Sequence, residues 1–348
     1  MSPGRPAGGS GTRDLVTGAL GFAGLHLVRA LLRSGREVTG FGKQPDDSAP
    51  PAVVGGFTRT GGDSGAAVTY AGADGSFTYV TGSVTDADAV REALATARPA
   101  VIYHLAAQSS AAASFAAPAE TLSANLLGTL HLLEAVRALP AAERPFILAI
   151  GSAEEYGPQP GITFLDEETS LAPVSPYAVS KAAQTLLCRQ YHRAHDVPVV
   201  IARPFSHTGP GQHPRFAFPS FARQIAAAEA DRGPTEILTG DLSPVRDFLD
   251  VRDVVNAYRL LAARGAPGEV YNICSGTALT MAEGLRILVS AAAVPVTVRR
   301  DPSRDRPADT PRLVGDNRKL REGTGWAPER NVASALLDLL AEARKELS

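Results

Sequence analysis

Short apolar runs alternate with longer segments of helical periodicity in the part of the chain that precedes Arg203. The runs are rich in Val, Ile, Leu and aromatic residues, as buried strands are, whereas the intervening segments repeat their apolar residues every three or four positions. This alternation predicts an α/β fold, namely a Rossmann-type doubly wound parallel sheet with helices on both faces. The strands predicted in this way span residues 15–17, 37–41, 77–80, 101–105, 146–150 and 197–202.

Two of the intervening segments carry specific helical signals. Asp86 is a residue of the N-cap type in front of a helical pattern. Leu122, Leu126, Leu130 and Leu133 recur at spacings of four, four and three, which predicts one apolar helix face. Further predicted elements are helices at 25–33, 120–138, 176–195 and 332–347, the last of them amphipathic, and a core strand at 270–273.

The regular alternation is interrupted by residues 44–76 and ends after Arg203. The 44–76 segment is rich in Gly, Ala, Asp and Pro, and we interpret it as a flexible insertion. It either covers a ligand or is a solvent-exposed loop without a role in binding. Pro and Gly clusters after Arg203 are typical of a pocket wall above a rigid sheet. The predicted domains are a Rossmann domain at 13–205 that also receives about 246–276, a smaller α/β substrate domain over most of 206–348, and a loose tail at 1–12.

The composition limits the kinds of partner that the chain can have. Its 348 residues carry a formal net charge of −2, which gives no electrostatic footprint for nucleic acid or an anionic membrane. The sequence has no run of about 18 apolar residues, and its Gly-, Pro- and Ser-rich beginning lacks the apolar core of a signal peptide. We therefore expect a cytoplasmic protein. We expect no metal site, because the His and Cys residues have no zinc-type spacing.

Three glycines stand between the first predicted strand and the helix after it. Gly18, Gly21 and Gly24 form the pattern G-x-x-G-x-x-G. Glycine permits a tight turn and lets backbone amides approach a pyrophosphate at the N-terminus of a helix. In this strand–turn–helix context the pattern predicts a dinucleotide-binding site, to which we also assign Phe22 from the same stretch.

The end of the second predicted strand indicates which dinucleotide is bound. Sites that prefer NAD usually place a carboxylate there, which binds the ribose hydroxyl groups. In this chain Gly42 stands at that position and Lys43 follows it. Because a cation at this place favours a ribose phosphate, we predict NADP(H), with NAD as the alternative.

A tyrosine and a lysine four residues apart provide a means of moving a proton. Tyr177 and Lys181 share one face of a predicted helix because of this spacing. A tyrosine has a reference pKa of about 10, and a neighbouring ammonium group and a cationic nicotinamide would stabilise its phenolate and bring that pKa closer to the working pH. Such pairs also occur by chance, so the interpretation depends on the glycine motif upstream.

A polar segment directly follows the fifth predicted strand. Ser152, Glu154 and Glu155 lie in the run Gly-Ser-Ala-Glu-Glu-Tyr-Gly. Because ligands of open α/β sheets bind at the carboxyl ends of the strands, Ser152 is placed to form a hydrogen bond with a substrate oxygen. The two glutamates are adjacent, so we expect their side chains to diverge, one toward a pocket and the other toward solvent.

Together these motifs resemble those of extended short-chain dehydrogenases/reductases that act on nucleotide sugars, within the NAD(P)-dependent epimerase/dehydratase family. The resemblance extends from about Asp14 to about Leu340, and its most specific signals are the segments 17–24, 104–107, 152–157 and 177–181. The segments 203–212, 219–224, 246–253 and 270–276 resemble the GDP-mannose branch, which includes GDP-mannose 4,6-dehydratases and the 4-reductases that act on their product.

The resemblance implies catalytic and cofactor roles. Ser152 would orient the O4 atom of the sugar, Tyr177 would exchange a proton with that atom, and Lys181 would hold the nicotinamide ribose. Further cofactor contacts are implied for Leu105, Ala106, Ala107 and Pro204.

The resemblance also implies a substrate site for a GDP-linked sugar. Arg246 and Arg306 would bind the diphosphate, and Arg223 would lie near the nucleotide. Two residues depart from the family pattern: Ser206 replaces an asparagine that lies near the substrate phosphates, and Asp305 puts a carboxylate into the diphosphate-binding run.

The resemblance favours a 4-reductase that transfers hydride to C4 of a 4-keto-6-deoxy GDP-sugar. The arginine-rich segment that dehydratases usually carry after the position of His207 is absent. Glu154, however, occupies the position of the dehydratases' catalytic glutamate, so a 4,6-dehydratase or an epimerase is the alternative. The resemblance further implies a homodimer formed through the helices at 120–138 and 176–195.

Overall fold

The structure is a computed structural model that describes residues 12–43, 55–61, 67–231, 233–305 and 310–347. The chain divides into two compact units. The first contains Met1–Ser152, Ser175–Arg203 and Val255–Tyr271, and the second contains Ala153–Val174, Pro204–Val254 and Asn272–Ser348. Of the residues predicted for the Rossmann domain, 153–174, 204–205, 246–254 and 272–276 belong to the second unit.

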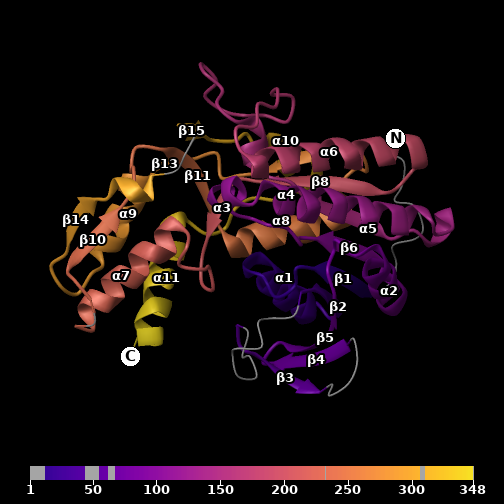
Figure 1. Ribbon diagram of the computed structural model, residues 1–348, viewed down its shortest axis with the longest axis horizontal. Helices are drawn as coiled ribbons and strands as arrows, with labels where there is room; N and C mark the ends of the chain where they lie inside the picture. The colour runs from indigo at the N-terminus through magenta and orange to yellow at the C-terminus, as the bar shows by residue number, and fades with distance from the viewer. Residues whose placement is uncertain (1–11, 44–54, 62–66, 232, 306–309, 348) are drawn as a thin grey trace. The chain divides into compact units, whose positions relative to one another are not determined.

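The first unit holds a nine-stranded sheet, except for the last residues of two of its strands, which belong to the second unit. The strands are Arg13–Thr17 (β1), Glu37–Gly42 (β2), Phe57–Gly61 (β3), Ala67–Gly72 (β4), Gly75–Thr81 (β5), Val101–His104 (β6), Phe146–Ile150 (β7), Val199–Pro204 (β8) and Val270–Ile273 (β12). Their order is β12-β8-β7-β6-β1-β2-β5-β4-β3. Figure 1 labels all of these strands except β7 and β12. Pairing is parallel from β8 through β7, β6, β1 and β2 to β5. The predicted Rossmann-type parallel sheet is thus confirmed, and the strand order reverses at β1.

Part of the segment predicted as a flexible insertion is regular. β3 and β4 form an antiparallel pair, and β4 pairs antiparallel with β5, so the hairpin extends the sheet. The prediction is therefore wrong for residues 57–61, 67–72 and 75–76, which lie in β3, β4 and β5, while 44–54 and 62–66 lie outside the described residues. The physical reason is a short period-two pattern within the Gly- and Ala-rich sequence, which buries Phe57, Val68 and Tyr70.

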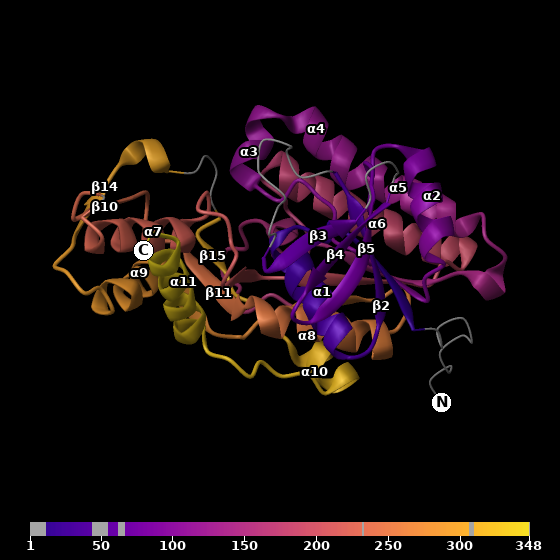
Figure 2. The same cartoon turned by 90° about the horizontal axis from the view of Figure 1, so that it is seen from below.

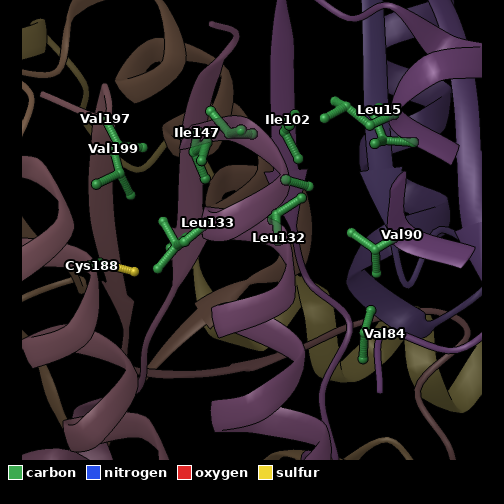
Figure 3. Close-up of a cluster of buried hydrophobic side chains, with 14 of the residues drawn as sticks. Leu15, Val84, Val90, Ile102, Leu132, Leu133, Ile147, Cys188, Val197 and Val199 are labelled. Atoms are coloured by element: carbon green, nitrogen blue, oxygen red, sulfur yellow. The ribbon is translucent and has the colours of Figure 1, made fainter. Parts of the chain in front are cut away.

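The core of the first unit lies between the sheet and three helices. In Figure 3, Leu132 and Leu133 lie close to Ile102 and Ile147 of the sheet, with Cys188 beside them. Figure 2 shows α1 and α8 on the opposite face. The helices of this unit are Phe22–Arg33 (α1), Ala87–Ala97 (α2), Ala111–Ala116 (α3), Pro118–Leu122 (α4), Gly128–Arg137 (α5), Pro176–His195 (α6) and most of Val251–Arg264 (α8), and the core helices are α2, α5 and α6.

Two local predictions for these helices have different outcomes. Asp86 caps α2, because its carboxylate accepts hydrogen bonds from the backbone amides of Asp88 and Ala89. The single leucine-faced helix, in contrast, is divided into α4, a π-helical turn at Ser123–Leu127 and α5. The extra residue per turn rotates the faces relative to each other, so Leu133 is fully buried whereas Leu122 is 36% exposed.

The second unit contains smaller sheets and a separate core. Its elements are Ser206–Thr208 (β9), Ala217–Glu229 (α7), Glu236–Thr239 (β10), Val245–Asp250 (β11), Ala278–Thr280 (β13), Met281–Ser290 (α9), Thr297–Arg300 (β14), Arg312–Leu313 (β15), Arg318–Thr324 (α10) and Val332–Leu347 (α11). β11 pairs with β9, β13 and β15, and β10 pairs with β14. α11 is the predicted amphipathic helix and packs with α7 and α9 around a common core. Within the described part of the chain, no helix is both long and apolar enough to span a membrane.

Candidate active site

The glycine turn connects β1 to α1 at the carboxyl edge of the sheet. Gly18 has φ +71°, and a Cβ atom there would lie 2.9 Å from the backbone nitrogen of Ala106. A Cβ atom on Gly24 would lie 2.2 Å from the carbonyl oxygen of Gly18. Gly21 is the N-cap of α1, so no side chain covers the first backbone amides of that helix. A bare helix N-terminus within a glycine cradle fits the pyrophosphate of a dinucleotide. Phe22, the first residue of α1, is half-buried beside this turn.

The loop that follows β6 lies against the glycine turn. The Leu105 amide donates to the carbonyl oxygen of Thr17 over 3.2 Å, and the Ala106 amide donates to the Thr17 hydroxyl oxygen over 3.1 Å. Leu105, Ala106 and Ala107 are all half-buried. The loop thus lies where the strand order reverses, which is the ligand-binding edge of doubly wound sheets.

A buried histidine connects this loop to the helices. The His104 Nδ1 and Nε2 atoms lie 2.9 Å from the Thr17 hydroxyl oxygen and 3.0 Å from the Thr129 hydroxyl oxygen. Because the Thr129 hydroxyl donates to the carbonyl oxygen of Asn125, we assign the proton of His104 to Nε2. Burial, and then the charge of Lys181, lower the pKa of His104 to about 3, so this ring stays neutral near pH 7.

The same network reaches the helix that carries the tyrosine. The Asn125 side chain accepts from the Gln108 amide over 2.7 Å and donates to the Ser180 hydroxyl oxygen over 2.8 Å. The Ser180 hydroxyl in turn donates to the carbonyl oxygen of Tyr177 over 2.7 Å. Hydrogen bonds therefore join the loop after β6 to the first turn of α6, which restrains both.

α6 carries Tyr177 and Lys181 as predicted, on a firmly capped first turn. The Ser175 hydroxyl oxygen accepts from the Ala178 amide over 3.1 Å, and Pro176 occupies the first helical position. Tyr177 is half-buried. It lies close enough to Tyr258 to raise that tyrosine's pKa, after the larger effect of burial.

Lys181 is buried at the carboxyl end of β7. Its ammonium group donates to the Ile150 carbonyl oxygen over 2.7 Å and to the Gln184 side-chain oxygen over 2.9 Å. Ser152, two residues beyond Ile150, is 8% exposed. The strand end and α6 thus bring the lysine to the segment that carries the serine, within the first unit.

The residues after Ser152 belong to the second unit. They form a turn of 3₁₀-helix at Ala153–Tyr156, in which Glu155 is fully buried and Glu154 is half-buried. The Tyr156 hydroxyl donates to the Asn272 side chain over 2.8 Å. The two adjacent glutamates therefore have different environments, as expected, and Glu154 is the more accessible of the pair.

The predicted substrate residues are spread over the second unit. Ser206 is half-buried in β9, and Pro204 is buried just before it. Arg246 is 5% exposed in β11, and its guanidinium donates to the Val245 carbonyl oxygen. Arg223 is exposed on α7, with Glu346 3.8 Å away. Arg306 lies outside the described residues.

A pocket of about 540 Å³ opens in the second unit between α7, the end of β10 and the segment after β14. Its walls combine apolar side chains with both signs of charge. The Arg215 guanidinium lies 5.1 Å from the centre of the Phe216 ring, and both residues line the pocket. Arg300 and Arg304 line it as well, as does Ser220, which lies one turn before Arg223.

Asp305, which departs from the family pattern, holds two walls of this pocket together. One of its carboxylate oxygens accepts from the Asp241 amide over 2.7 Å, and the other accepts from the Arg300 guanidinium over 2.7 Å. The negative charge is therefore offset by an arginine. Arg215 and Arg300 belong to no motif that the sequence reveals; the only available signal was the aperiodic, Pro-containing sequence around each of them.

The first unit defines the class of protein. A parallel sheet with a glycine cradle, a Tyr-x-x-x-Lys pair on α6 and a serine after β7 are the features of an extended short-chain dehydrogenase/reductase fold. Among the described residues there is no group of three or more His, Cys, Asp and Glu side chains that could hold a metal ion.

Comparison with known proteins identifies the family. The model of the GDP-mannose 4,6 dehydratase family matches residues 15–338, and the chain belongs to this family. It is 39% identical over 245 residues to a GDP-6-deoxy-D-mannose reductase from Pseudomonas aeruginosa, covering 70% of this chain and 80% of the relative. It is 34% identical over 328 residues to a dTDP-glucose 4,6-dehydratase from Streptomyces antibioticus, covering 92% and 89%. The structure of RMD from Pseudomonas aeruginosa complexed with NADPH superposes with a TM-score of 0.77 at 31% identity, covering 96% of this chain and all of the other. The chain is accordingly a nucleotide-sugar enzyme.

Proposed function

We propose that this protein is an NADP(H)-dependent 4-reductase of a GDP-linked 4-keto-6-deoxy-hexose. The observation that carries the proposal is the Tyr177–Lys181 pair on α6, at the carboxyl edge of a sheet whose glycine turn fits a dinucleotide. The likeness to a GDP-6-deoxy-D-mannose reductase supports this choice of reaction.

The end of β2 supports NADP(H) as the cofactor. Gly42 provides no carboxylate for a ribose, and the exposed Lys43 follows it directly. The related RMD structure contains NADPH. Gly18, Gly21 and Gly24 would hold the pyrophosphate, Phe22 and residues 105–107 would adjoin the dinucleotide, and Lys43 would attract the 2′-phosphate.

The chain's own residues would then manage the proton and the orientation of the sugar. Bound NADPH would supply a hydride to C4. As the C4–H bond forms and the carbonyl double bond opens, Tyr177 would give its phenolic proton to O4, and water would later restore that proton. Ser152 would hold O4 by a hydrogen bond, and the buried Lys181 ammonium would hold the ribose and favour the phenolate.

The second unit would bind the nucleotide part of the substrate. Its 540 Å³ pocket offers the Phe216 ring as an apolar surface and three arginines for phosphate or base oxygens. We propose this pocket for the nucleotide, in addition to the predicted Arg223, Arg246 and Ser206. Arg306 remains a proposed diphosphate ligand on the strength of the family resemblance.

The decisive experiment mixes the purified protein with GDP-4-keto-6-deoxymannose and NADPH and follows absorbance at the nicotinamide band. We expect one NADPH to be oxidised per sugar, with NADH slower. We expect Glu154→Gln to retain the rate within about fivefold, because a reductase does not remove the C5 proton. Glu168→Gln, an exposed glutamate of the same unit, is the matched control.

The alternative is a 4,6-dehydratase, which the half-buried Glu154 and the likeness to a dTDP-glucose 4,6-dehydratase favour. A dehydratase recycles its cofactor and needs Glu154 for proton abstraction. No net oxidation of NADPH, together with conversion of GDP-mannose that Glu154→Gln abolishes, would replace the reductase by this function.

We also propose that the protein is a homodimer through α4, α5 and α6. α6 exposes Leu186 and Val179, which are 61% and 45% exposed, and the π-helical turn between α4 and α5 exposes Leu127, which is 46% exposed. α6 further carries a shallow groove of about 260 Å³ lined by Leu186 and Arg189. Exposed apolar side chains on neighbouring helices are typical of an interface between subunits.

Leu186→Glu is expected to convert the dimer into a monomer, because it places a charge on the most exposed of these apolar side chains in both copies. Light scattering should give about half the mass of the native protein. Leu337→Glu, at a 44% exposed leucine of α11, serves as the control and should remain dimeric. A native protein with the mass of one chain would refute the dimer.

A further inference from the structure

The ring of Tyr79 in β5 covers two glycines of β2. In the parallel register Gly40 pairs with Tyr79, and Gly42 stands two residues further along the same face. A Cβ atom on Gly40 would lie 2.8 Å from the Cδ2 atom of Tyr79, and a Cβ atom on Gly42 would lie 2.9 Å from the Tyr79 hydroxyl oxygen. The tyrosine side chain therefore extends along β2. Its hydroxyl group lies at the end of the strand, in the space that a side chain at residue 42 would enter.

The hydroxyl group also fixes the backbone at that end. It donates a hydrogen bond to the carbonyl oxygen of Lys43 over 2.7 Å. The two preceding carbonyl groups are held as well: Phe41 accepts from the Gly18 amide over 2.7 Å, and Gly42 accepts from the Gly82 amide over 2.8 Å. The carbonyl groups of Phe41, Gly42 and Lys43 are thus all hydrogen-bonded, directly before and at the position where the Lys43 side chain is exposed. Tyr79 is 2% exposed, and burial raises its pKa, so it stays a donor near neutral pH.

The inserted hairpin holds the tyrosine ring in place. Tyr70 of β4 packs edge-on against Tyr79 with ring centres 5.9 Å apart, and it stacks on Phe77 at 5.4 Å. Phe57 of β3 packs edge-on against Phe77 at 5.2 Å. All four rings are buried, so the hairpin supplies one wall of the cluster that orients Tyr79.

We propose that Tyr79 is a specificity-determining residue for the cofactor. Its hydroxyl group occupies the space that a carboxylate at position 42 requires, and its hydrogen bond to the Lys43 carbonyl group presents the Lys43 side chain to a ribose 2′-phosphate. This inference deepens the proposed function and rests on it, because it assumes that NADP(H) is the cofactor. It also gives β3 and β4 a role, because they support the cofactor site through the aromatic cluster.

Selection against NAD then resides in two residues rather than one. A carboxylate at residue 42 would bind the ribose hydroxyl groups of NADH, but only if its Cβ atom does not meet the Tyr79 hydroxyl group. Gly42→Asp alone should therefore fail to improve NADH binding. Combining it with Tyr79→Phe removes the obstructing oxygen and the bond that holds Lys43.

The test measures dissociation constants for NADPH and for NADH by calorimetric titration of the full-length protein without sugar. We expect Tyr79→Phe to weaken NADPH binding about fivefold, the worth of one hydrogen bond, and to change NADH binding less than twofold. We expect Gly42→Asp to leave NADH binding within about twofold, and the double variant to bind NADH about tenfold more tightly than the native protein. Tyr70→Phe, which removes a hydroxyl group from the same aromatic cluster, is the control and should preserve the NADPH-to-NADH ratio.

Two results would overturn the inference: an equal loss of affinity for both cofactors in Tyr79→Phe, or an NADH gain in Gly42→Asp as large as in the double variant. Should the aspartate variants fail to fold by circular dichroism, the Tyr79→Phe ratio decides alone. Failure of the proposed function is distinguishable. A protein that binds NADPH with this Tyr79 dependence but oxidises none with the sugar keeps the inference and loses the reductase, whereas native binding that favours NADH removes both.

Discussion

Replacing Tyr177 with phenylalanine is expected to lower kcat of the reductase reaction about a thousandfold. The phenolic hydroxyl group is the proposed source of the proton for O4, and a positioned acid of this kind contributes about a hundred- to ten-thousandfold to the rate. The ring and its packing remain in the variant. NADPH binding should therefore stay within about twofold of the native value, so the loss falls on kcat rather than on cofactor affinity.

Steady-state oxidation of NADPH and a separate NADPH titration measure the two quantities. Tyr191→Phe is a suitable control, because Tyr191 lies on the same helix and its hydroxyl group bonds to Glu134, within the described part of the first unit. It should retain the native rate within about twofold. A Tyr177→Phe enzyme that keeps more than a tenth of the native rate would show that another group protonates O4.

The parallel strands could be predicted from the sequence because burial on both faces makes them continuous apolar runs. Val101–His104 and Phe146–Ile150 are buried at every position, and their predicted bounds agree with the structure to within a residue. The antiparallel hairpin could not be predicted in the same way. β4 alternates in burial over its first four residues, and both strands are short and surrounded by Gly and Ala, so their signal is weak.

The candidate site could be predicted where chemistry depends on local spacing. Tyr177 and Lys181 are brought together by one helix, and Ser152 by the end of one strand. The residues around Tyr79 were missed because their contact joins β2, β4 and β5, and no spacing within a single segment reveals it. For the same reason the walls of the pocket in the second unit, such as Arg215 and Arg300, follow no periodic pattern.

The π-helical turn between α4 and α5 is a second feature that the hydrophobic pattern could not predict. The four leucines from Leu122 to Leu133 have ideal helical spacing, yet a π-helical turn separates the first from the last. Asn125 lies in that turn and is 1% exposed, with its side chain bonded to Gln108 and Ser180. Satisfying a buried amide in this way can outweigh a regular helix, and side-chain periodicity does not report it.

The three glycines of the motif are equivalent in the sequence pattern, but their steric surroundings in the structure differ. Gly24 packs its backbone against the Gly18 carbonyl group, where a Cβ atom would approach to 2.2 Å. Gly21 has φ −75°, a conformation open to any residue, and its Cβ atom would lie 3.2 Å from the Gly18 carbonyl oxygen. Gly24 is therefore required for the fold of the turn, whereas the absence of a side chain at Gly21 leaves room for a ligand above the helix N-terminus.

Gly24→Ala is accordingly expected to lower the free energy of unfolding by about 3 kcal/mol, as overpacking against an immobile backbone does, and the apparent Tm by about 4–7 °C. NADPH affinity should fall more than a hundredfold, because the turn that carries the helix amides must shift.

Gly21→Ala should keep Tm within about 2 °C of the native protein while weakening NADPH binding at least tenfold, since its methyl group enters the path of the pyrophosphate. Differential scanning fluorimetry and calorimetric titration measure both effects. Equal losses of Tm in the two variants would show that the turn needs both glycines for folding, and unchanged NADPH affinity in Gly21→Ala would place the pyrophosphate elsewhere.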